Sequence, residues 1–417
     1  MLFHSDLSME CMGIAMNDMD DKALDRIISE AMQKKQQADD ADTAAGEQIL
    51  HGDTNPPRGG KRRKKSWTKR RVIITVLVSV LAAVFVVSGV ALALVWQKVG
   101  KINYVPSTFD NSILDSIPDD DTDSNAINSD QSDIDKADQD LIDNLKNHAQ
   151  ELTFSDNVYN ILLVGTDARS KTERGRSDSM ILVSINKETK EITLTSFMRD
   201  LYVAIPGKQN NRINAAYAFG GPAMLISTIQ NNFGIRIDRF AQVNFYSFMD
   251  VIDEIGGVQI TVTDAEVAVM NNYIQEQNKL EGDPLDTDKL SGGGTYNLTG
   301  KQALGYCRIR YVGNADYQRT QRQRDVLMKV IEKAKGMSVS ELSDFVDVFF
   351  PQITTDMTQG EVFGMILKAP TYLSYDINQL RIPLNNSYRS MTIRDMSVLV
   401  PDFAANTAAL KKELYGE

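Results

Sequence analysis

Arginine dominates the polar motifs in the second half of this sequence. Between residues 160 and 325 there are twelve arginines and seven lysines. Most of these arginines fall in short segments that end an expected strand or begin an expected helix: GTDAR, RGRSD, RD, RINAAY, RIR and DYQRTQRQR. The planar guanidinium matches phosphate oxygens two at a time and keeps its charge, so the pattern predicts a receptor for a pyrophosphate. Surface salt bridging is the alternative for any single arginine.

Two aspartates stand inside this arginine-rich stretch. Asp167 follows an apolar run and Asp178 precedes the next one. Magnesium binds one or two carboxylates together with phosphate oxygens and water, so the pair predicts a metal–pyrophosphate site. The alternative is that each aspartate pairs with a neighbouring arginine. Asp200 and Asp316 are expected to orient arginines.

The spacing of the last two motifs predicts which side chains share a face. If residues 306–311 are extended, Arg308 and Arg310 point to the same side. On the helix that follows, Arg319 and Gln323 are four residues apart and share one face, which continues into valines. Such a stripe predicts polar groups at a pocket and the valines in the core.

Other chemistries are excluded by the residues that are missing. No histidine follows His148, which removes Ser-His-Asp triads and histidine-bound metals from the expected folded part. Cys11 and Cys307 are too few for a disulfide framework or a zinc site. The segment 294–302 resembles a phosphate-binding loop, but it has five residues between its glycines and glutamine where serine or threonine is required.

Strands and helices alternate from about residue 152, which predicts one layered α/β domain. Strands are expected at 158–164, 180–186, 191–197, 242–248, 257–262 and 379–382, and helices at 222–233, 320–334, 339–349, 358–369 and 402–415. Residues 271–297 are expected to form a polar, glycine-rich loop.

An uncharged segment, residues 72–96, predicts a single membrane span. A helix of that length covers about 37 Å, enough to cross a ~30 Å hydrocarbon core. The preceding residues, 58–71, hold nine basic residues and no acidic one, so the N-terminus is expected in the cytoplasm and the rest outside, as in a single-pass type II protein of the cell membrane. The basic run is also expected to contact anionic lipid.

Changes in composition along the chain predict four parts. They are a cytoplasmic tail (1–71), the span (72–96), an acidic extracellular stalk (97–150) and a folded extracellular domain (151–417). The stalk interpretation depends on residues 110–143, which carry twelve aspartates and one lysine and are expected to be extended. The formal net charge of −11 argues against nucleic acid as a partner.

Seven segments in this order resemble the LytR-CpsA-Psr family of envelope phosphotransferases: NILLVGTDAR, GRSDSMILVSIN, SFMRDLYV, RINAAYAFGG, DVIDEIGGVQITV, LTGKQALGYCRIRY and DYQRTQRQRDVL. The resemblance implies a three-layer α/β/α sandwich with a hydrophobic groove for a polyprenyl chain. It also implies transfer of a glycopolymer from a polyprenyl-pyrophosphate carrier to peptidoglycan. Apolar residues of 222–233 and 242–248 are candidates for that groove, or equally for the core.

The resemblance also assigns roles residue by residue. Asp167 and Asp178 match magnesium ligands, with manganese as the substitute metal. The positions around the pyrophosphate are matched by Arg169, Arg176, Arg199, Arg308, Arg310 and Arg319, and those of substrate binding by Arg212, Asn214, Arg322 and Gln323. The family has Phe-Gly where this chain has Tyr317-Gln318, a change expected to reshape the pocket floor.

The implied reaction is attack of a peptidoglycan hydroxyl on the phosphorus next to the glycopolymer. The arginines and magnesium stabilise charge on the departing polyprenyl phosphate. Without histidine, an aspartate is the base, or a loose transition state needs none. The alternatives are a polyprenyl-pyrophosphate hydrolase and a membrane-tethered regulator. The sequence leaves open whether the polymer is wall teichoic acid, capsule or an arabinogalactan-type glycan.

Overall fold

The computed structural model describes residues 92–106, 126–148, 152–167, 175–310, 312–313 and 315–416. The chain divides into two compact units, Met1–Val78 and Ser79–Glu417, and all the described residues belong to the second. Arg169 and most of the predicted span lie outside the described residues. Within the described ranges, no helix is both long and apolar enough to cross a membrane.

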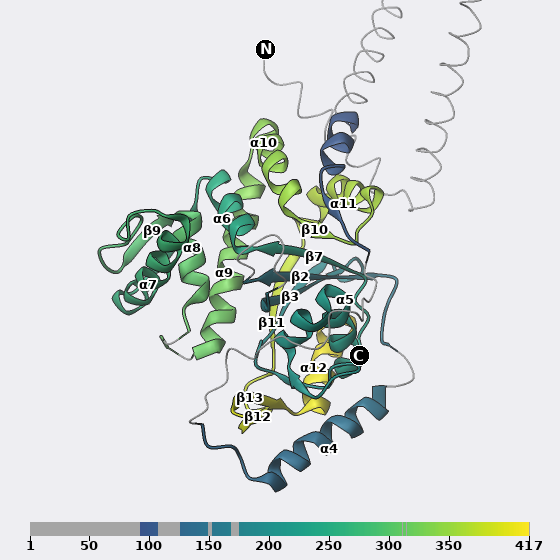
Figure 1. The fold of residues 1–417 in the computed structure, drawn as a ribbon. Coiled ribbons are helices and arrows are strands. Elements are labelled where there is room, and N and C mark those ends of the chain that lie inside the picture. The colour runs from purple at the N-terminus through teal and green to yellow at the C-terminus, as the bar shows by residue number, and fades with distance from the viewer. Residues whose placement is uncertain are drawn as a thin grey trace, which may run out of the picture. The chain divides into compact units, whose positions relative to one another are not determined.

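A mixed sheet of seven strands forms the centre of the domain, in the order β1-β10-β7-β2-β3-β4-β11 (Figure 1). Its strands are β1 (Asn103–Tyr104), β2 (Val158–Thr166), β3 (Ser177–Asn186), β4 (Glu191–Phe197), β7 (Arg239–Asn244), β10 (Thr354–Thr355) and β11 (Asp376–Ile382). β2, β3 and β4 run antiparallel to one another, while β7 joins β2 and β11 joins β4 in parallel. This confirms a mixed α/β fold. The predicted strands at 158–164, 180–186, 191–197 and 379–382 all belong to this sheet.

Three two-stranded pairs, nine α-helices and a helical segment at residues 92–99 make up most of the remaining described secondary structure. The pairs are β5 (Tyr202–Val203) with β6 (Asn211–Arg212), β8 (Val258–Val262) with β9 (Gly294–Leu298), and β12 (Tyr388–Ile393) with β13 (Met396–Pro401). The helices are α4 (Gln131–His148), α5 (Ile213–Phe233), α6 (Phe245–Glu254), α7 (Asp264–Glu281), α8 (Gly300–Arg308), α9 (Ala315–Gly336), α10 (Val339–Phe349), α11 (Gln359–Tyr372) and α12 (Phe403–Tyr415). A short 3-10 turn, η2, spans Phe350–Gln352.

The main core lies between the sheet and the helices α5 and α12. Phe233 at the end of α5 packs its ring 5.3 Å from that of Phe197 on β4 and 5.9 Å from that of Phe403 on α12. Leu225 and Ile229 of α5 are fully buried in the same cluster. The apolar face of residues 222–233, a candidate for a lipid groove, is therefore core in this structure.

A Gly-Gly pair bends α5. Gly221 has φ of +64°, which side chains other than glycine rarely adopt, and a Cβ on Gly220 would lie 2.6 Å from the Cβ of Met224. The predicted helix starting at Pro222 is the part after this bend, and the first part begins at Ile213.

A second core lies under α6, α7, α8 and the β8–β9 pair. The prediction of a loop at 271–297 is wrong for its first part, because α7 extends to Glu281. This helix begins with a capping box between Thr263 and Glu266 and buries Met270 and Ile274 at helical spacing. The strand predicted at 242–248 is also too long, since the Asn244 side chain accepts a hydrogen bond from the Ser247 backbone and starts α6 there.

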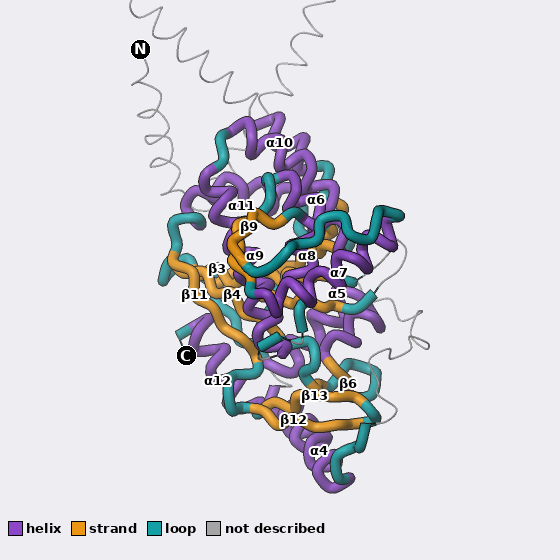
Figure 2. The backbone as a smooth tube through the Cα atoms, turned by 90° about the vertical axis from the view of Figure 1, so that its left-hand side faces the viewer, coloured by secondary structure: helices purple, strands orange, loops and turns teal. Residues whose placement is uncertain are grey.

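The acidic stalk prediction is wrong for the residues that the structure describes. Residues 131–148 form α4, whose Leu141 is buried in the main core. Figure 2 shows α4 below the β12–β13 pair. The Asn144 side chain donates to the backbone oxygen of Asn232, and Arg389 on β12 pairs with Asp140 at 2.9 Å. Aspartates on the outer face do not prevent helix formation when alanine and leucine cover the inner face.

Candidate active site

Asp178, at the start of β3, lies next to Arg199, just after β4. Because β3 and β4 are antiparallel, the start of one strand and the end of the other meet at the same end of the sheet. Arg199 Nη1 donates to Asp178 Oδ1 at 2.8 Å, and only 8% of the Arg199 side chain is exposed. Burial raises the pKa of Asp178, but the charges of Arg199, Arg319 and Arg308 and the bond from Arg199 outweigh it and lower the pKa to about 2. Asp178 is therefore a carboxylate at any physiological pH.

Asp167, directly after β2, is the second carboxylate at this end of the sheet. Its Oδ1 accepts a 2.6 Å hydrogen bond from the backbone N–H of Arg176 across the hairpin mouth. Burial raises the pKa of Asp167, and the nearby negative charge of Asp178 raises it further. Because the two negative charges repel each other, a cation bound beside them would stabilise both carboxylates. Arg176 lies at this hairpin mouth, as predicted.

Helix α9 covers Asp178 with the stripe that the sequence predicts. Arg319 Nη2 lies 3.4 Å from the Asp178 carbonyl oxygen, and Gln323 Nε2 lies 3.5 Å from the same atom. Val326 continues the same face three residues after Gln323 and is buried in the second core. The polar end of the stripe thus faces the strand ends and its apolar end faces the core.

Asp200 and Asp316 hold the remaining arginines in one network. Arg310 bonds Asp316 at 3.0 Å and reaches Asp200 at 3.4 Å. Arg319 Nε lies 3.2 Å from Asp316, and Arg212 Nη1 lies 3.7 Å from Asp200. Burial raises the pKa of Asp200, and the charge of Asp316 adds to that rise. The predicted orienting role of both aspartates agrees with these contacts.

Arg308 reaches the same region from α8, but not from an extended segment. The expectation that residues 306–311 are extended is wrong, because Arg308 is the last residue of α8. Its guanidinium pairs with Glu276 at 3.0 Å and lies 4.4 Å over the ring of Tyr273. Both partners belong to α7, which sequence reasoning assigned to a loop. The capping box and the apolar spacing of that helix were the signals that identify it.

Arg322 does not join this cluster. Its side chain is 2% exposed, and its Nε and Nη2 both bond Glu266 Oε1, at 3.0 and 2.9 Å. Its Nη1 and Nη2 also approach the carbonyl oxygens of Ile309 and Val312. The predicted substrate contact of Arg322 is therefore replaced by a structural one that ties α9 to α7.

Asn214 is fully buried beside Arg199, to whose carbonyl its backbone N–H donates at 3.3 Å. Among the described residues, neither its side-chain oxygen nor its side-chain nitrogen has a hydrogen-bond partner. A buried amide in that state is stabilised by a polar ligand group. Arg169, the remaining predicted contact, is outside the described residues.

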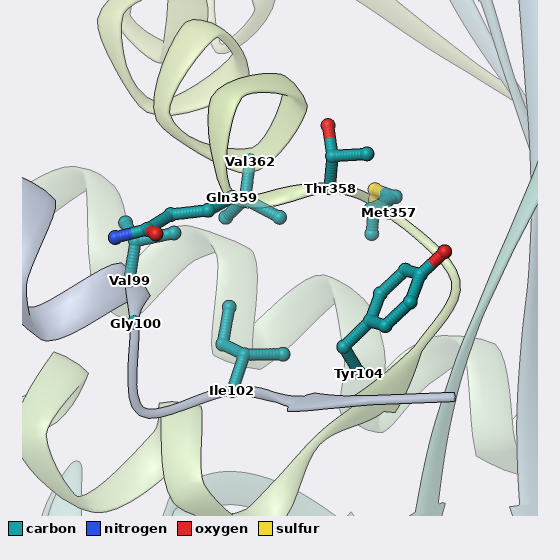
Figure 3. Close-up of a pocket in the computed structure, with 8 residues that line it drawn as sticks. All are labelled: Val99, Gly100, Ile102, Tyr104, Met357, Thr358, Gln359 and Val362. Atoms are coloured by element: carbon teal, nitrogen blue, oxygen red, sulfur yellow. The ribbon is translucent and has the colours of Figure 1, made fainter. Parts of the chain in front are cut away.

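A separate pocket of about 310 Å³ lies between the segment around β1 and the start of α11 (Figure 3). It is lined by Val99, Gly100, Ile102, Tyr104, Met357, Thr358, Gln359 and Val362. None of these side chains is charged and none belongs to the predicted site, so this pocket does not provide a diphosphate site.

The mixed α/β domain places two carboxylates and several arginines at one end of its sheet. The model of the LytR_cpsA_psr family matches residues 124–412, and the chain belongs to that family. The resemblance found in the sequence is thereby confirmed. The match includes α4, in agreement with its packing on the domain.

Curated relatives and solved structures share this domain. TagU of Bacillus cereus, a polyisoprenyl-teichoic acid–peptidoglycan teichoic acid transferase, is 34% identical over 210 residues, which is 49% of this chain and 62% of TagU. Biofilm regulatory protein A of Streptococcus mutans is 33% identical over 221 residues, 50% of this chain and 52% of its own length. The chain thus spans between half and two thirds of these relatives. A structure of TagT bound to LI-WTA is 26% identical with a TM-score of 0.50, and covers 63% of this chain and 92% of TagT.

Proposed function

We propose that this protein transfers a glycopolymer from a polyprenyl-pyrophosphate carrier to peptidoglycan, forming a phosphodiester. The observation that carries the proposal is the ion pair of Asp178 with Arg199 at the end of the sheet, where Arg319 donates to the Asp178 carbonyl and Asp167 lies nearby. The teichoic acid transferase activity of TagU and the LI-WTA ligand of the TagT structure support the same substrate class. The three-layer α/β/α arrangement that the family resemblance implies is part of the proposal.

Magnesium is proposed as the metal, held by Asp167 and Asp178. The described residues include no group of three or more histidine, cysteine or acidic side chains that could hold a metal. Two carboxylates are enough for magnesium when phosphate oxygens and water complete its shell, and the raised pKa of Asp167 fits a site that a cation neutralises. When bound, the metal would supply Lewis-acid stabilisation of phosphate charge.

The arginines would bind and orient the diphosphate. Arg199 and Arg319 are nearly buried and held by carboxylates, so they are pre-organised and do not need to reorient when charge develops on the leaving phosphate. Arg308 and Arg310 are 21% and 25% exposed, which leaves them accessible to a ligand. The reaction exchanges one phosphorus–oxygen bond for another, and the proton of the attacking hydroxyl passes to an aspartate or to the solvent.

The transfer itself is testable with purified full-length protein in detergent. The protein, a polyprenyl-pyrophosphate glycan and peptidoglycan fragments should yield a glycan–peptidoglycan phosphodiester, detected by mass spectrometry. Without acceptor, little glycan phosphate should be released. Equal release with and without acceptor would instead identify a hydrolase. No turnover, together with loss of function on deletion of residues 1–57, would favour a regulator.

The membrane placement remains a proposal, supported by the uncharged residues 72–96 and the basic run 58–71. A reporter enzyme that is active only outside the cytoplasm, fused after Glu417, should be active. The same reporter fused before residue 58 should be inactive and serves as the control. The reverse pattern would contradict a type II topology.

A further inference from the structure

A second pair of arginines lies beside the candidate active site and has no role in it. Arg324, on α9, is 4% exposed, and three neutral oxygens accept its hydrogen bonds. They are Ser196 Oγ at 2.6 Å, Gln321 Oε1 at 2.6 Å and Gln379 Oε1 at 2.9 Å. All three partners are neutral, and the charge of Asp325 only partly offsets the burial of the guanidinium.

Arg381, on β11, is the partly exposed member of the pair. It donates to the Pro383 carbonyl at 3.2 Å and to Asn385 Oδ1 at 2.6 Å. Its guanidinium lies 4.1 Å over the ring of Tyr317, which in turn lies 5.7 Å from the ring of Tyr388. Its Nη1 makes no hydrogen bond with the described residues. The ring and the two acceptors fix the guanidinium and leave one edge for a ligand.

Within the described part of the chain, neither arginine forms an ion pair with a carboxylate. The carboxylate of Asp325 raises the pKa of Arg324 through its charge, but it accepts a hydrogen bond from Gln321 and forms no ion pair with Arg324. Burial and the charge of Arg381 lower the pKa of Arg324 to about 10, and burial lowers that of Arg381 as well. By contrast, Arg199, Arg319 and Arg322 each have an acidic partner. A buried arginine cannot lose its proton readily, so an unpaired one is costly unless an anion binds nearby.

The position of the pair links it to the diphosphate site. β11 lies beside β4 at the sheet edge (Figure 2) and runs parallel to it. Arg381 is in register with Ser196, three residues before Arg199. Tyr317 follows Asp316, which bonds Arg310. A substrate that extends from the diphosphate along the end of the sheet therefore reaches Arg381.

We propose that Arg381, backed by Arg324 and held by Tyr317, binds an anionic group carried by the saccharide part of the substrate. The ligand class is a phosphate- or carboxylate-bearing saccharide. This inference rests on the proposed function and adds to it a subsite outside the diphosphate site. The anion belongs either to the transferred polymer or to the peptidoglycan acceptor, and the two sources differ in chemistry.

Binding, measured by calorimetry with the full chain in detergent, tests the subsite without requiring turnover. A phosphorylated chitobiose represents an anionic polymer, a muramic acid disaccharide represents the acceptor carboxylate, and diacetylchitobiose is the neutral probe. Arg381→Gln should weaken the binding of one anionic probe about tenfold, the loss expected for one charge-assisted contact. The probe that is affected identifies the source. Unchanged affinity for both anionic probes would overturn the proposal.

Two further variants separate charge from folding. Asn385→Asp places a carboxylate beside Arg381 at an exposed position, so it should weaken the same probe while raising the thermal midpoint. Arg389→Gln removes an exposed arginine that pairs with Asp140 and should leave the affinity unchanged. Equal weakening by Arg389→Gln, or normal binding by Asn385→Asp, would contradict a specific subsite. Because these are binding measurements, a failure of transfer activity leaves their outcome interpretable.

Discussion

Asp178→Asn is expected to lower the rate of transfer on the order of a thousandfold. A loss of this size is typical when one residue is removed from a group of catalytic residues that act together. Asparagine retains an oxygen for the hydrogen bond from Arg199, so the fold should survive while the negative charge is lost. Asp178→Ala is a weaker test of chemistry, because it leaves Arg199 buried without this partner and costs about 3–5 kcal/mol of stability. Turnover and thermal midpoint should be measured on the same preparation.

The proposed sharing of one metal ion by Asp178 and Asp167 predicts how a double variant should behave. If both hold one metal ion, the Asp167→Asn and Asp178→Asn double variant should lose little more activity than either single variant. Binding of Mn²⁺, followed by electron paramagnetic resonance, should be lost in each single variant independently of turnover. Asp200→Asn is the control, since that carboxylate is held by Arg199, Arg212, Arg310 and Asp316 and is not a proposed metal ligand, so the variant should retain Mn²⁺ binding. Additive losses with Mn²⁺ binding intact would indicate two separate salt bridges.

The strands around the site were predictable because their patterns are strong. Residues 158–164 are apolar except for Asn160, and such a run is typical of a strand buried on both faces. The antiparallel pairing of β3 and β4 follows from the short turn between them. Once that pairing is assumed, Asp178 and Arg199 must lie at the same end of the sheet. The central contact of the site is thus encoded in local sequence.

Other contacts depend on tertiary structure that local patterns do not show. Arg322 and Arg319 are three residues apart on α9 and chemically identical, yet one bonds Glu266 and the other approaches Asp178. The difference depends on where α7 packs, and α7 carries so many polar residues that its composition resembles a loop. The same applies to α4, whose acidic composition suggested an extended stalk although Ala137 and Leu141 have the spacing of a buried helix face. Composition describes the exposed face of a helix, whereas packing depends on its buried face.

Arg319→Lys is expected to lower transfer about thirtyfold, which corresponds to about 2 kcal/mol. Arginine contacts Asp316 through Nε and the Asp178 carbonyl through Nη2, and both contacts require the planar fork. Lysine keeps the charge but offers a single ammonium, so the contact to diphosphate oxygens changes from a pair of bonds to a point contact. The same change at Arg308 should have a comparable effect on turnover.

The two variants differ in their expected effect on stability. The Arg319 side chain is only 5% exposed, so Arg319→Lys should also lower the thermal midpoint, contrary to what a solvent-accessible pocket would predict. Arg308 is 21% exposed and keeps an acidic neighbour, Glu276, so Arg308→Lys should melt close to the wild type. Arg308→Lys is therefore the cleaner test of bidentate binding.

Arg322→Lys is the matched control, since it makes the same change on the same helix. Arg322 bonds Glu266 through two nitrogens and is 2% exposed, so its replacement should lower the thermal midpoint and leave the turnover of folded protein near normal. If Arg308→Lys and Arg319→Lys both retain full activity, the site needs only positive potential and the bidentate model is wrong. If activity falls in all three variants in proportion to the midpoint, these arginines stabilise the fold, and phosphate recognition must lie with other residues. A loss of turnover confined to Arg308→Lys and Arg319→Lys would show that these guanidinium groups bind the diphosphate through two hydrogen bonds each. Of the three arginines, only these two face the end of the sheet where Asp178 lies.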